Sequence, residues 1–184
     1  KESAEKLLLP LVEEVRRRLG KVVYDVLDTD GGSLALSAVR ALKQRGWTIA
    51  TAESLTGGLI ASSMVEVPGA SQVVKGGFVT YQSVSKTMLL GVPAEMIEQY
   101  DVVSAEVARA MAKGARERLG VDIAVSATGL AGPDGGTPER PVGTVFLGIA
   151  TAKGVYDIPL HLTGNRARIR TLTMKNALNA VRLE

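Results

Sequence analysis

Short apolar segments rich in β-branched residues alternate with segments of helical periodicity along most of the chain, and this alternation limits the possible folds more than any other feature. Such a pattern predicts an α/β fold in which helices cover both faces of a sheet. The last two apolar segments are separated only by a turn at 152–154, which predicts an antiparallel hairpin and therefore a mixed sheet. The expected strands are WTIATA (47–52), VVKGGFVTY (73–81), VDIAVSAT (121–128), VGTVFLGIAT (142–151) and VYDIPL (155–160).

The helical segments have recognisable ends. Ser33 and Ser104 are expected to cap helices, because a serine hydroxyl can accept a hydrogen bond from a free N–H of the first turn. The turn TDGGS (29–33) separates two parts. We expect residues 1–30 to be a remnant of a preceding domain or linker, and residues 31–184 to form the main domain. The expected helices cover 4–19, 33–45, 56–67, 104–119 and 165–183, with two short ones around GVP (91–93) and a further strand at 22–27.

The composition excludes several classes of function. The chain has no cysteine, so it can form neither a disulfide framework nor a thiolate nucleophile nor a cysteine metal site. Asp134 is the only acid in the longest glycine-rich loop, and no histidine pair is present, so we expect no metal and no cofactor. No apolar run approaches the roughly 18 residues that span a bilayer. We therefore expect no membrane partner, and the absence of cysteine fits the reducing cytosol expected of a cytoplasmic protein.

Ser54 stands where a buried strand is predicted to turn into a helix, in the string Glu53-Ser54-Leu55-Thr56-Gly57-Gly58. Helix starts offer unpaired N–H groups that can stabilise an oxyanion or hold a phosphate. The two glycines permit a close approach of the backbone. Ser54 or Thr56 can equally serve as a helix cap, and spacing alone does not decide between the two roles.

Two more loops follow predicted strands. Residues 128–138 are crowded with glycine and proline, and a long permissive loop at the end of a buried strand is where α/β proteins place ligands. The other loop, 81–86, ends at Lys86, which can act as a base if burial lowers its pKa. His161 is the only histidine, and its surroundings do not indicate a Ser-His-Asp triad. If the chain uses a serine nucleophile, a lysine is therefore its natural base.

The string Ser83-Val84-Ser85-Lys86 also matches the S-x-x-K motif of penicillin-recognising enzymes. A four-letter match arises often by chance, and the partner strings S-D-N and K-T-G are missing. We therefore favour Ser54 over Ser83 as the nucleophile.

Four strings, in order over about residues 33–183, resemble the CinA C-terminal domain family, also called the nicotinamide mononucleotide deamidase family. They are ATAESLTGGLIAS, GGFVTYQSVSKTMLLGV, SATGLAGPDGGTPERPVGTVFLGIA and GNRARIRTLTMKNAL. The resemblance implies hydrolysis of the nicotinamide carboxamide to nicotinate mononucleotide and ammonia, by a metal-free dyad carried onto Ser54 and Lys86. It also implies that the chain is the C-terminal part of a protein with an N-terminal CinA domain.

The same resemblance assigns further residues. Tyr81, Thr56 and Thr128 fall on motif positions of the active site, and Arg166 matches an arginine of a GDR-type motif in which this chain has Asn165 instead of aspartate. Leu55 stands where the family often has cysteine. The candidate catalytic residues are thus Ser54, Lys86 and Tyr81, and the candidate substrate-binding residues are Glu53, Thr56, Gly57, Gly58, Thr128, Gly129, Arg140 and Arg166.

Two other classes of function compete with this one. A non-catalytic nucleotide-binding or regulatory module would keep the glycine-rich loops without needing a neutral lysine. Nucleic-acid binding is suggested by the family's association with competence for DNA uptake, but the net charge is only +3 and seven aromatic residues give no stacking run. We expect a small-molecule substrate, a homo-oligomer and no direct nucleic-acid partner.

Overall fold

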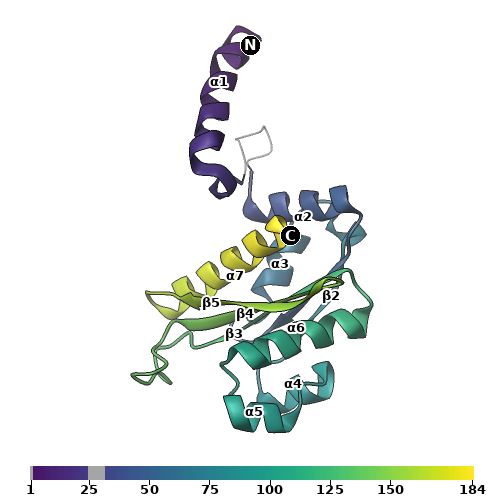
Figure 1. Ribbon diagram of the computed structural model, residues 1–184, viewed down its shortest axis with the longest axis vertical. Helices are drawn as coiled ribbons and strands as arrows, with labels where there is room; N and C mark the ends of the chain where they lie inside the picture. The colour runs from purple at the N-terminus through teal and green to yellow at the C-terminus, as the bar shows by residue number, and fades with distance from the viewer. Residues whose placement is uncertain (1, 25–31) are drawn as a thin grey trace.

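A five-stranded mixed sheet forms the centre of the computed structural model, which describes residues 2–24 and 32–184 (Figure 1). The strand order is β2–β1–β3–β4–β5. β1 runs parallel to β2 and β3, whereas β3–β4 and β4–β5 are antiparallel, so the predicted mixed sheet and terminal hairpin are confirmed. The strands are β1 (Ile49–Glu53), β2 (Val74–Val79), β3 (Ile123–Gly129), β4 (Thr144–Thr151) and β5 (Gly154–His161).

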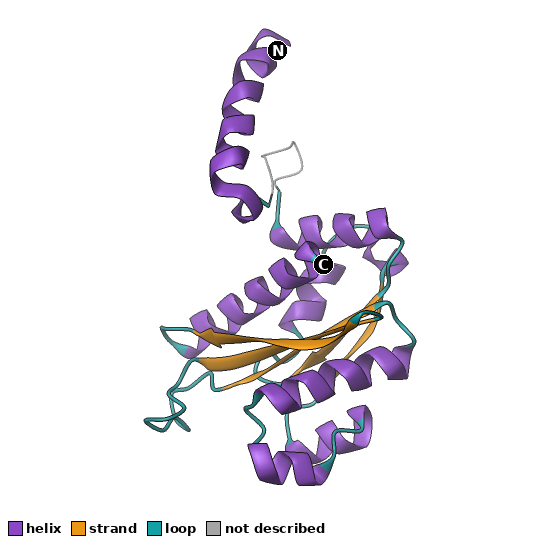
Figure 2. Cartoon of the chain, viewed as in Figure 1, coloured by secondary structure: helices purple, strands orange, loops and turns teal. Residues whose placement is uncertain are grey.

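Helices cover both faces of the sheet, as Figure 2 shows. One face is covered by α2 (Leu34–Arg45), α3 (Leu59–Val65) and α7 (Arg166–Leu183), and the other by α6 (Ala105–Leu119), against which α4 (Ser83–Leu90) and α5 (Ala94–Tyr100) pack. The predicted caps are confirmed. Ser33 Oγ accepts a hydrogen bond from the N–H of Leu36, and Ser104 Oγ accepts one from the N–H of Val107.

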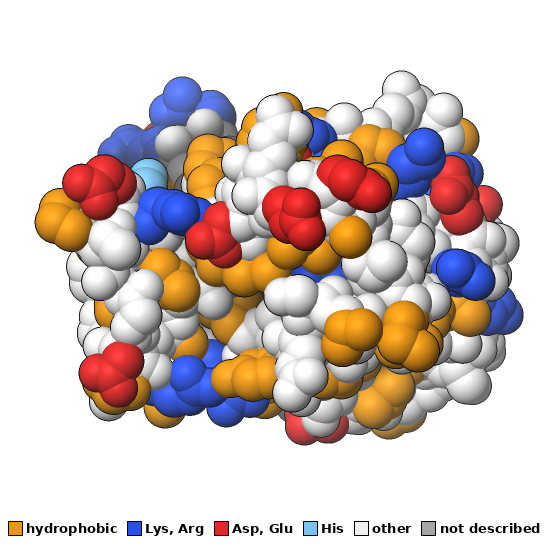
Figure 3. All heavy atoms as spheres, turned by 90° about the horizontal axis from the view of Figure 1, so that it is seen from below, with side chains coloured by type: hydrophobic (Ala, Val, Ile, Leu, Met, Phe, Trp, Pro, Cys, Tyr) orange, Lys and Arg blue, Asp and Glu red, His pale blue; other side chains and the backbone are white. Residues whose placement is uncertain are grey.

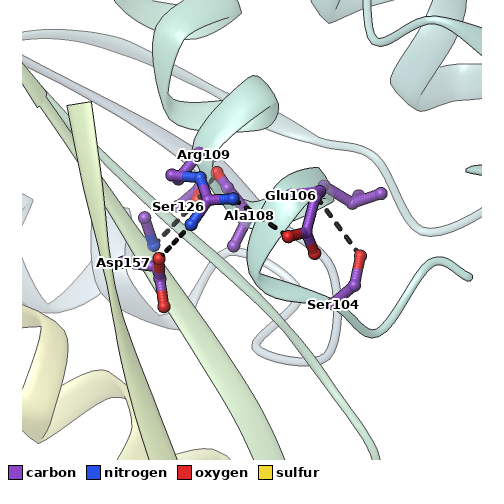
Figure 4. Close-up of polar contacts among 8 residues, drawn as sticks. Ser104, Glu106, Ala108, Arg109, Ser126 and Asp157 are labelled. Atoms are coloured by element: carbon purple, nitrogen blue, oxygen red, sulfur yellow. Dashed lines mark hydrogen bonds and ion pairs between the residues drawn. The ribbon is translucent and has the colours of Figure 1, made fainter. Parts of the chain in front are cut away.

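The central strands are apolar on both sides, because each side packs against a helical layer. Ile49 contributes to the core beneath α2, α3 and α7, while Ala50 and Ala52 belong to the core beneath α6. The side chain of Ser126 on β3 fastens α6 to the sheet (Figure 4): its Oγ donates to the Ala108 carbonyl oxygen at 2.6 Å and accepts from the Gly148 N–H at 3.1 Å. Figure 4 also shows Arg109 of the same helix bound to Asp157 of β5 and to Glu106.

Gly114 lets α4 approach α6 more closely than any residue with a side chain would. A Cβ atom at this position would lie 1.9 Å from the carbonyl oxygen of Leu90, the last residue of α4. The two helices therefore meet backbone against backbone. This contact sets the position of α4, which carries Lys86.

The N-terminal segment differs from its prediction. Helix α1 (Glu2–Leu19) forms and extends away from the layered domain, with Leu7, Leu11 and Val15 exposed (Figure 1). The strand expected at 22–27 is wrong for residues 22–24, and residues 25–27 lie outside the described residues. Gly20–Val22 instead forms a short 3₁₀ turn. The backbone carbonyls there are bound by side chains from helices rather than by a neighbouring strand. The Lys21 carbonyl accepts a hydrogen bond from Arg182 of α7, and the Tyr24 carbonyl accepts one from the Ser37 hydroxyl of α2.

Candidate active site

Ser54 lies at the carboxyl edge of the sheet, directly after the buried strand β1. Its N–H donates to the Ala127 carbonyl oxygen at 2.9 Å and so continues the parallel pairing of β1 with β3. The backbone of Ser54 is therefore fixed by the sheet, while the chain beyond it turns toward α3. The residue is 9% exposed, and it lines a pocket.

Lys86 approaches Ser54 from α4, the helix that follows β2. Its Nζ lies 3.2 Å from Ser54 Oγ and donates a hydrogen bond of 2.7 Å to the Thr80 carbonyl oxygen. The side chain is 1% exposed. The structure thus brings together the two residues that the sequence assigned to the dyad, although 32 positions separate them along the chain.

Burial lowers the pKa of Lys86 to about 8, because an ammonium loses hydration energy when it leaves water. In the part of the chain that the structure describes, no carboxylate forms an ion pair with Lys86 to oppose this shift. The uncharged form of the amine is therefore populated near neutral pH. With one N–H donated to Thr80, the amine can direct its lone pair at the hydroxyl of Ser54.

The pocket over the dyad has a volume of about 590 Å³. Loops that follow β1, β2 and β3 meet here, as expected where the carboxyl ends of neighbouring parallel strands share an edge. Leu55, Val103 and Leu130 give it apolar walls. The full lining is Ser54, Leu55, Tyr81, Gln82, Ser83, Val84, Lys86, Val102, Val103, Thr128, Gly129, Leu130, Ala131 and Arg166.

Arg166, the first residue of α7, reaches the mouth of the pocket. One guanidinium nitrogen donates to the Gly132 carbonyl oxygen at 2.9 Å, and the other donates to the Tyr81 hydroxyl at 3.1 Å. The guanidinium thereby links the loop after β2 with the glycine-rich loop after β3. Tyr81 is 61% exposed, so its ring stands at the rim of the pocket.

Comparison with known proteins assigns this arrangement to a family. The family model described as the CinA C-terminal domain matches residues 32–184. The chain belongs to the CinA C-terminal domain family. The competence/damage inducible protein CihA from Agrobacterium tumefaciens is similar in structure, with a TM-score of 0.79 and 38% sequence identity over 85% of this chain and 96% of that one. A CinA superfamily protein from Klebsiella pneumoniae also has a TM-score of 0.79, at 30% identity over 82% of this chain and 94% of that one.

Curated relatives are longer than this chain. A CinA-like protein of Dictyoglomus thermophilum is 46% identical over 182 residues, which is 99% of this chain and 44% of that protein. A putative competence-damage inducible protein of Symbiobacterium thermophilum is 44% identical over 95% of this chain and 42% of its own length. The CinA domain described here therefore spans less than half of these relatives.

Thr128 and Gly129 of the CinA domain line the pocket with the dyad, at the end of β3. The Thr128 hydroxyl donates to the Val102 carbonyl oxygen at 2.6 Å, which fastens the α5–α6 turn to the pocket. Tyr81 also lines this pocket, but it forms no hydrogen bond with Lys86. Its hydroxyl binds Arg166, and Lys86 is held by the Thr80 carbonyl instead.

Glu53 is fully buried beneath the nucleophile loop and does not line the pocket. Its carboxylate accepts hydrogen bonds from the N–H groups of Gly58 at 2.9 Å, Ile60 at 3.1 Å and Ala61 at 2.9 Å. The acid thus caps α3, and the helix start is occupied by this side chain rather than open to a ligand. The helix begins only at Leu59, not at residue 56, because Gly57 and Gly58 have positive φ angles of 60° and 97°.

Three further candidates from the sequence also lie outside the pocket lining: Thr56, Gly57 and Gly58. Thr56 is fully buried, and its hydroxyl has no hydrogen-bond partner among the described residues. Arg140 lies outside the lining too and forms an ion pair of 3.0 Å with Asp101. Of the two arginines among the candidate substrate-binding residues, only Arg166 is at the pocket.

Sequence reasoning missed two groups of residues. Val102 and Val103 line the pocket from the turn before α6, where the sequence has no glycine cluster or polar motif to mark them. Arg170 binds the nucleophile loop through the Leu55 and Thr56 carbonyl oxygens. Its place in the string GNRARIRTLTMKNAL, one helical turn after Arg166, was the available signal.

Three further features of residues 2–24 and 32–184 concern metal, membrane and nucleic-acid sites. No group of three or more histidine, cysteine, aspartate or glutamate side chains is arranged to hold a metal ion there. In the same ranges, no helix is both long and apolar enough to cross a bilayer. The face drawn in Figure 3 has acidic and basic side chains interspersed rather than one large basic patch.

Proposed function

We propose that this CinA domain is a serine amidohydrolase that converts nicotinamide mononucleotide and water into nicotinate mononucleotide and ammonia. The observation that carries the proposal is the buried contact of 3.2 Å between Lys86 Nζ and Ser54 Oγ. A lysine that is neutral near pH 8 can remove the proton that a serine must lose as it attacks.

The reaction proceeds in two stages. Ser54 Oγ attacks the carboxamide carbon while Lys86 takes the hydroxyl proton, and Lys86 then gives that proton to the departing nitrogen, which leaves as ammonia. This forms an ester between Ser54 and the nicotinoyl group. Lys86 next removes a proton from water as the water attacks the ester, and then gives that proton to the departing Ser54 Oγ, which releases nicotinate mononucleotide and restores the free serine and the neutral lysine. No metal or cofactor is needed in either stage.

The activity test is ammonia release from nicotinamide mononucleotide by the purified chain. We expect steady release with matching formation of nicotinate mononucleotide, unchanged by EDTA. Tight binding of the mononucleotide without ammonia release would contradict the amidase proposal and favour the non-catalytic nucleotide-binding module. Strong inhibition by EDTA would point to metal-dependent hydrolysis instead.

The pH profile of kcat/KM is expected to rise with pH and to level off above about 8, the pKa of Lys86 in the folded protein. Below that value Lys86 is an ammonium and cannot accept the serine proton, so each pH unit should cost about tenfold in rate. The measurement is kcat/KM between about pH 6 and pH 10, a range that brackets the shifted and the ordinary lysine values. A profile that is flat, or that rises only near pH 10, would contradict a buried neutral lysine as the base.

Arg166 is the proposed phosphate ligand, because a guanidinium fork suits phosphate oxygens and this one stands at the pocket mouth. Arg166→Ala should raise KM for the mononucleotide by about tenfold to a hundredfold, as expected for the loss of charge-assisted hydrogen bonds. Arg140→Ala is the matched control and should leave KM nearly unchanged, since Arg140 pairs with Asp101.

The phosphate-free nucleoside separates a phosphate contact from general damage to the pocket. With nicotinamide riboside as substrate, Arg166→Ala and the unmodified chain should have similar KM values. An equal loss on both substrates would contradict the phosphate assignment, as would an unchanged KM for the mononucleotide.

A further inference from the structure

Arg170 on the second turn of α7 reaches the loop that carries the nucleophile. Its Nε donates to the Leu55 carbonyl oxygen at 2.9 Å, and its NH2 group donates to the Thr56 carbonyl oxygen at 2.8 Å. Two bonds from one rigid guanidinium to successive carbonyls fix the orientation of both peptide groups. A Cβ atom at Gly57 would meet the Arg170 NH2 group at 3.4 Å, an ordinary contact, so glycine is favoured here by its positive φ of 60° rather than by lack of space.

The orientation of these peptides determines where their N–H groups point. In a planar trans peptide, the N–H and the C=O point in opposite directions. The Leu55 carbonyl points at Arg170, so the Thr56 N–H of the same peptide points away from α7. The Ser54 carbonyl accepts from the Gly57 N–H at 3.1 Å, so the Leu55 N–H points away from the inside of the turn.

Most donors of this loop are already used. Between Leu55 and Ala61, the N–H groups with a partner belong to Gly57, Gly58, Leu59, Ile60 and Ala61. Within the described chain, the N–H groups of Leu55 and Thr56 have none. They directly follow the nucleophile, where an oxyanion formed by serine attack needs donors.

We propose that Arg170 is a positioning residue that holds the Leu55–Thr56 peptide so that its Thr56 N–H, next to the Leu55 N–H of the preceding peptide, meets the oxyanion. This inference rests on the proposed amidase function. Glu53 and Arg170 have complementary tasks in the loop: the carboxylate takes the N–H groups at the start of α3, and the guanidinium takes the carbonyls that precede them. A cation on the carbonyl side also polarises the peptide and strengthens its N–H as a donor.

Arg170→Ala tests the proposal through kcat and KM separately. Oxyanion contacts form only in the transition state, so kcat should fall while KM stays unchanged. Deleting an oxyanion donor costs about a hundredfold to a thousandfold, and we expect a smaller loss of about tenfold to a hundredfold because the donors remain but lose their orientation. The rise of kcat/KM near pH 8 should persist, because the burial of Lys86 is not altered. Arg168→Ala, from the exposed neighbouring arginine on α7, is the control.

A fluorophosphonate probe gives a readout that does not depend on the substrate, because it phosphonylates activated serines. When the serine attacks phosphorus, the phosphoryl oxygen of the probe takes the position of the oxyanion. We expect labelling of Ser54 in the unmodified chain and in Arg168→Ala, and labelling slowed by tenfold or more in Arg170→Ala. Arg170→Lys keeps a positive charge but loses the two-nitrogen fork that reaches both carbonyls, so its labelling rate should fall between the other two. If the alanine variant fails to fold, the same measurements on the lysine variant test the proposal.

Labelling and kcat of both Arg170 variants at the level of the unmodified chain would overturn the proposal, as would a rise in KM with unchanged kcat. A chain that is labelled at Ser54 but releases no ammonia from the mononucleotide would refute the proposed substrate. In that case the labelling rates alone decide the role of Arg170.

Discussion

Replacing Ser54 or Lys86 by alanine is expected to lower kcat for ammonia release by at least about a thousandfold, because each residue is needed for one half of the same proton transfer. The contact of 3.2 Å between them makes the two losses non-additive. Once either residue is missing, the other can no longer take part in the proton transfer. The double variant should therefore be scarcely slower than either single variant. The measurement is single-turnover and steady-state kinetics on all three variants.

Two controls sharpen this test. Ser83→Ala removes the serine of the S-x-x-K string and should retain most of the activity if Ser54 is the nucleophile. Lys75→Ala removes an exposed lysine on β2 and should have no effect. A Lys86→Ala chain with near-normal turnover would exclude Lys86 as the base, and an inactive Ser83→Ala chain beside an active Ser54→Ala chain would reverse the choice of nucleophile.

Glu53→Ala is expected to lower the free energy of unfolding by about 3–5 kcal/mol, because it leaves three buried or partly buried N–H groups without the charged acceptor that had satisfied them. The carboxylate is 0% exposed and accepts from three backbone N–H groups. Typical domains have only about 5–15 kcal/mol of stability in total. Urea unfolding followed by circular dichroism measures the change.

Glu53→Gln separates shape from charge at this position. One glutamine oxygen can replace Oε2 and keep the bonds from Gly58 and Ile60, while its amide group then faces the Ala61 N–H. The loss should therefore be intermediate. Glu66→Ala, at the exposed end of the same helix, should change stability by less than about 0.5 kcal/mol. A Glu53→Ala chain within that same margin would show that the carboxylate is not needed to cap α3.

Local patterns predicted the sheet and the covering helices, while the family resemblance supplied Ser54, Lys86 and Thr128, which the fold brings to one pocket. Apolar runs mark buried strands, and the loops after neighbouring parallel strands share one edge. The sequence could not predict which partner each polar side chain binds once the segments are packed together. Glu53 was assigned to the substrate, yet its carboxylate turns back to α3, a choice that depends on two glycines adopting left-handed conformations.

The arginines illustrate the same limit. Arg140 and Arg166 are equally plausible phosphate ligands in the sequence, and only the folded chain shows that Arg140 is paired with Asp101 while Arg166 lines the pocket. The valines of the α5–α6 turn had no sequence signal, since an apolar residue in a loop looks the same whether it faces a pocket or a core. At the other end of the chain, the strand expected at 22–27 required a neighbouring strand, which apolar content alone does not provide.

The contact between Gly114 and the Leu90 carbonyl has a consequence for how this domain can vary. Lys86 is carried by a helix whose distance from α6 is set by the missing side chain at position 114, so even alanine there would displace the lysine by pushing α4 outward. Helix propensity would favour alanine over glycine by about 1 kcal/mol, the opposite direction. In a mutational scan selected for activity, Gly114 should therefore be as intolerant as the dyad, although it does not line the pocket.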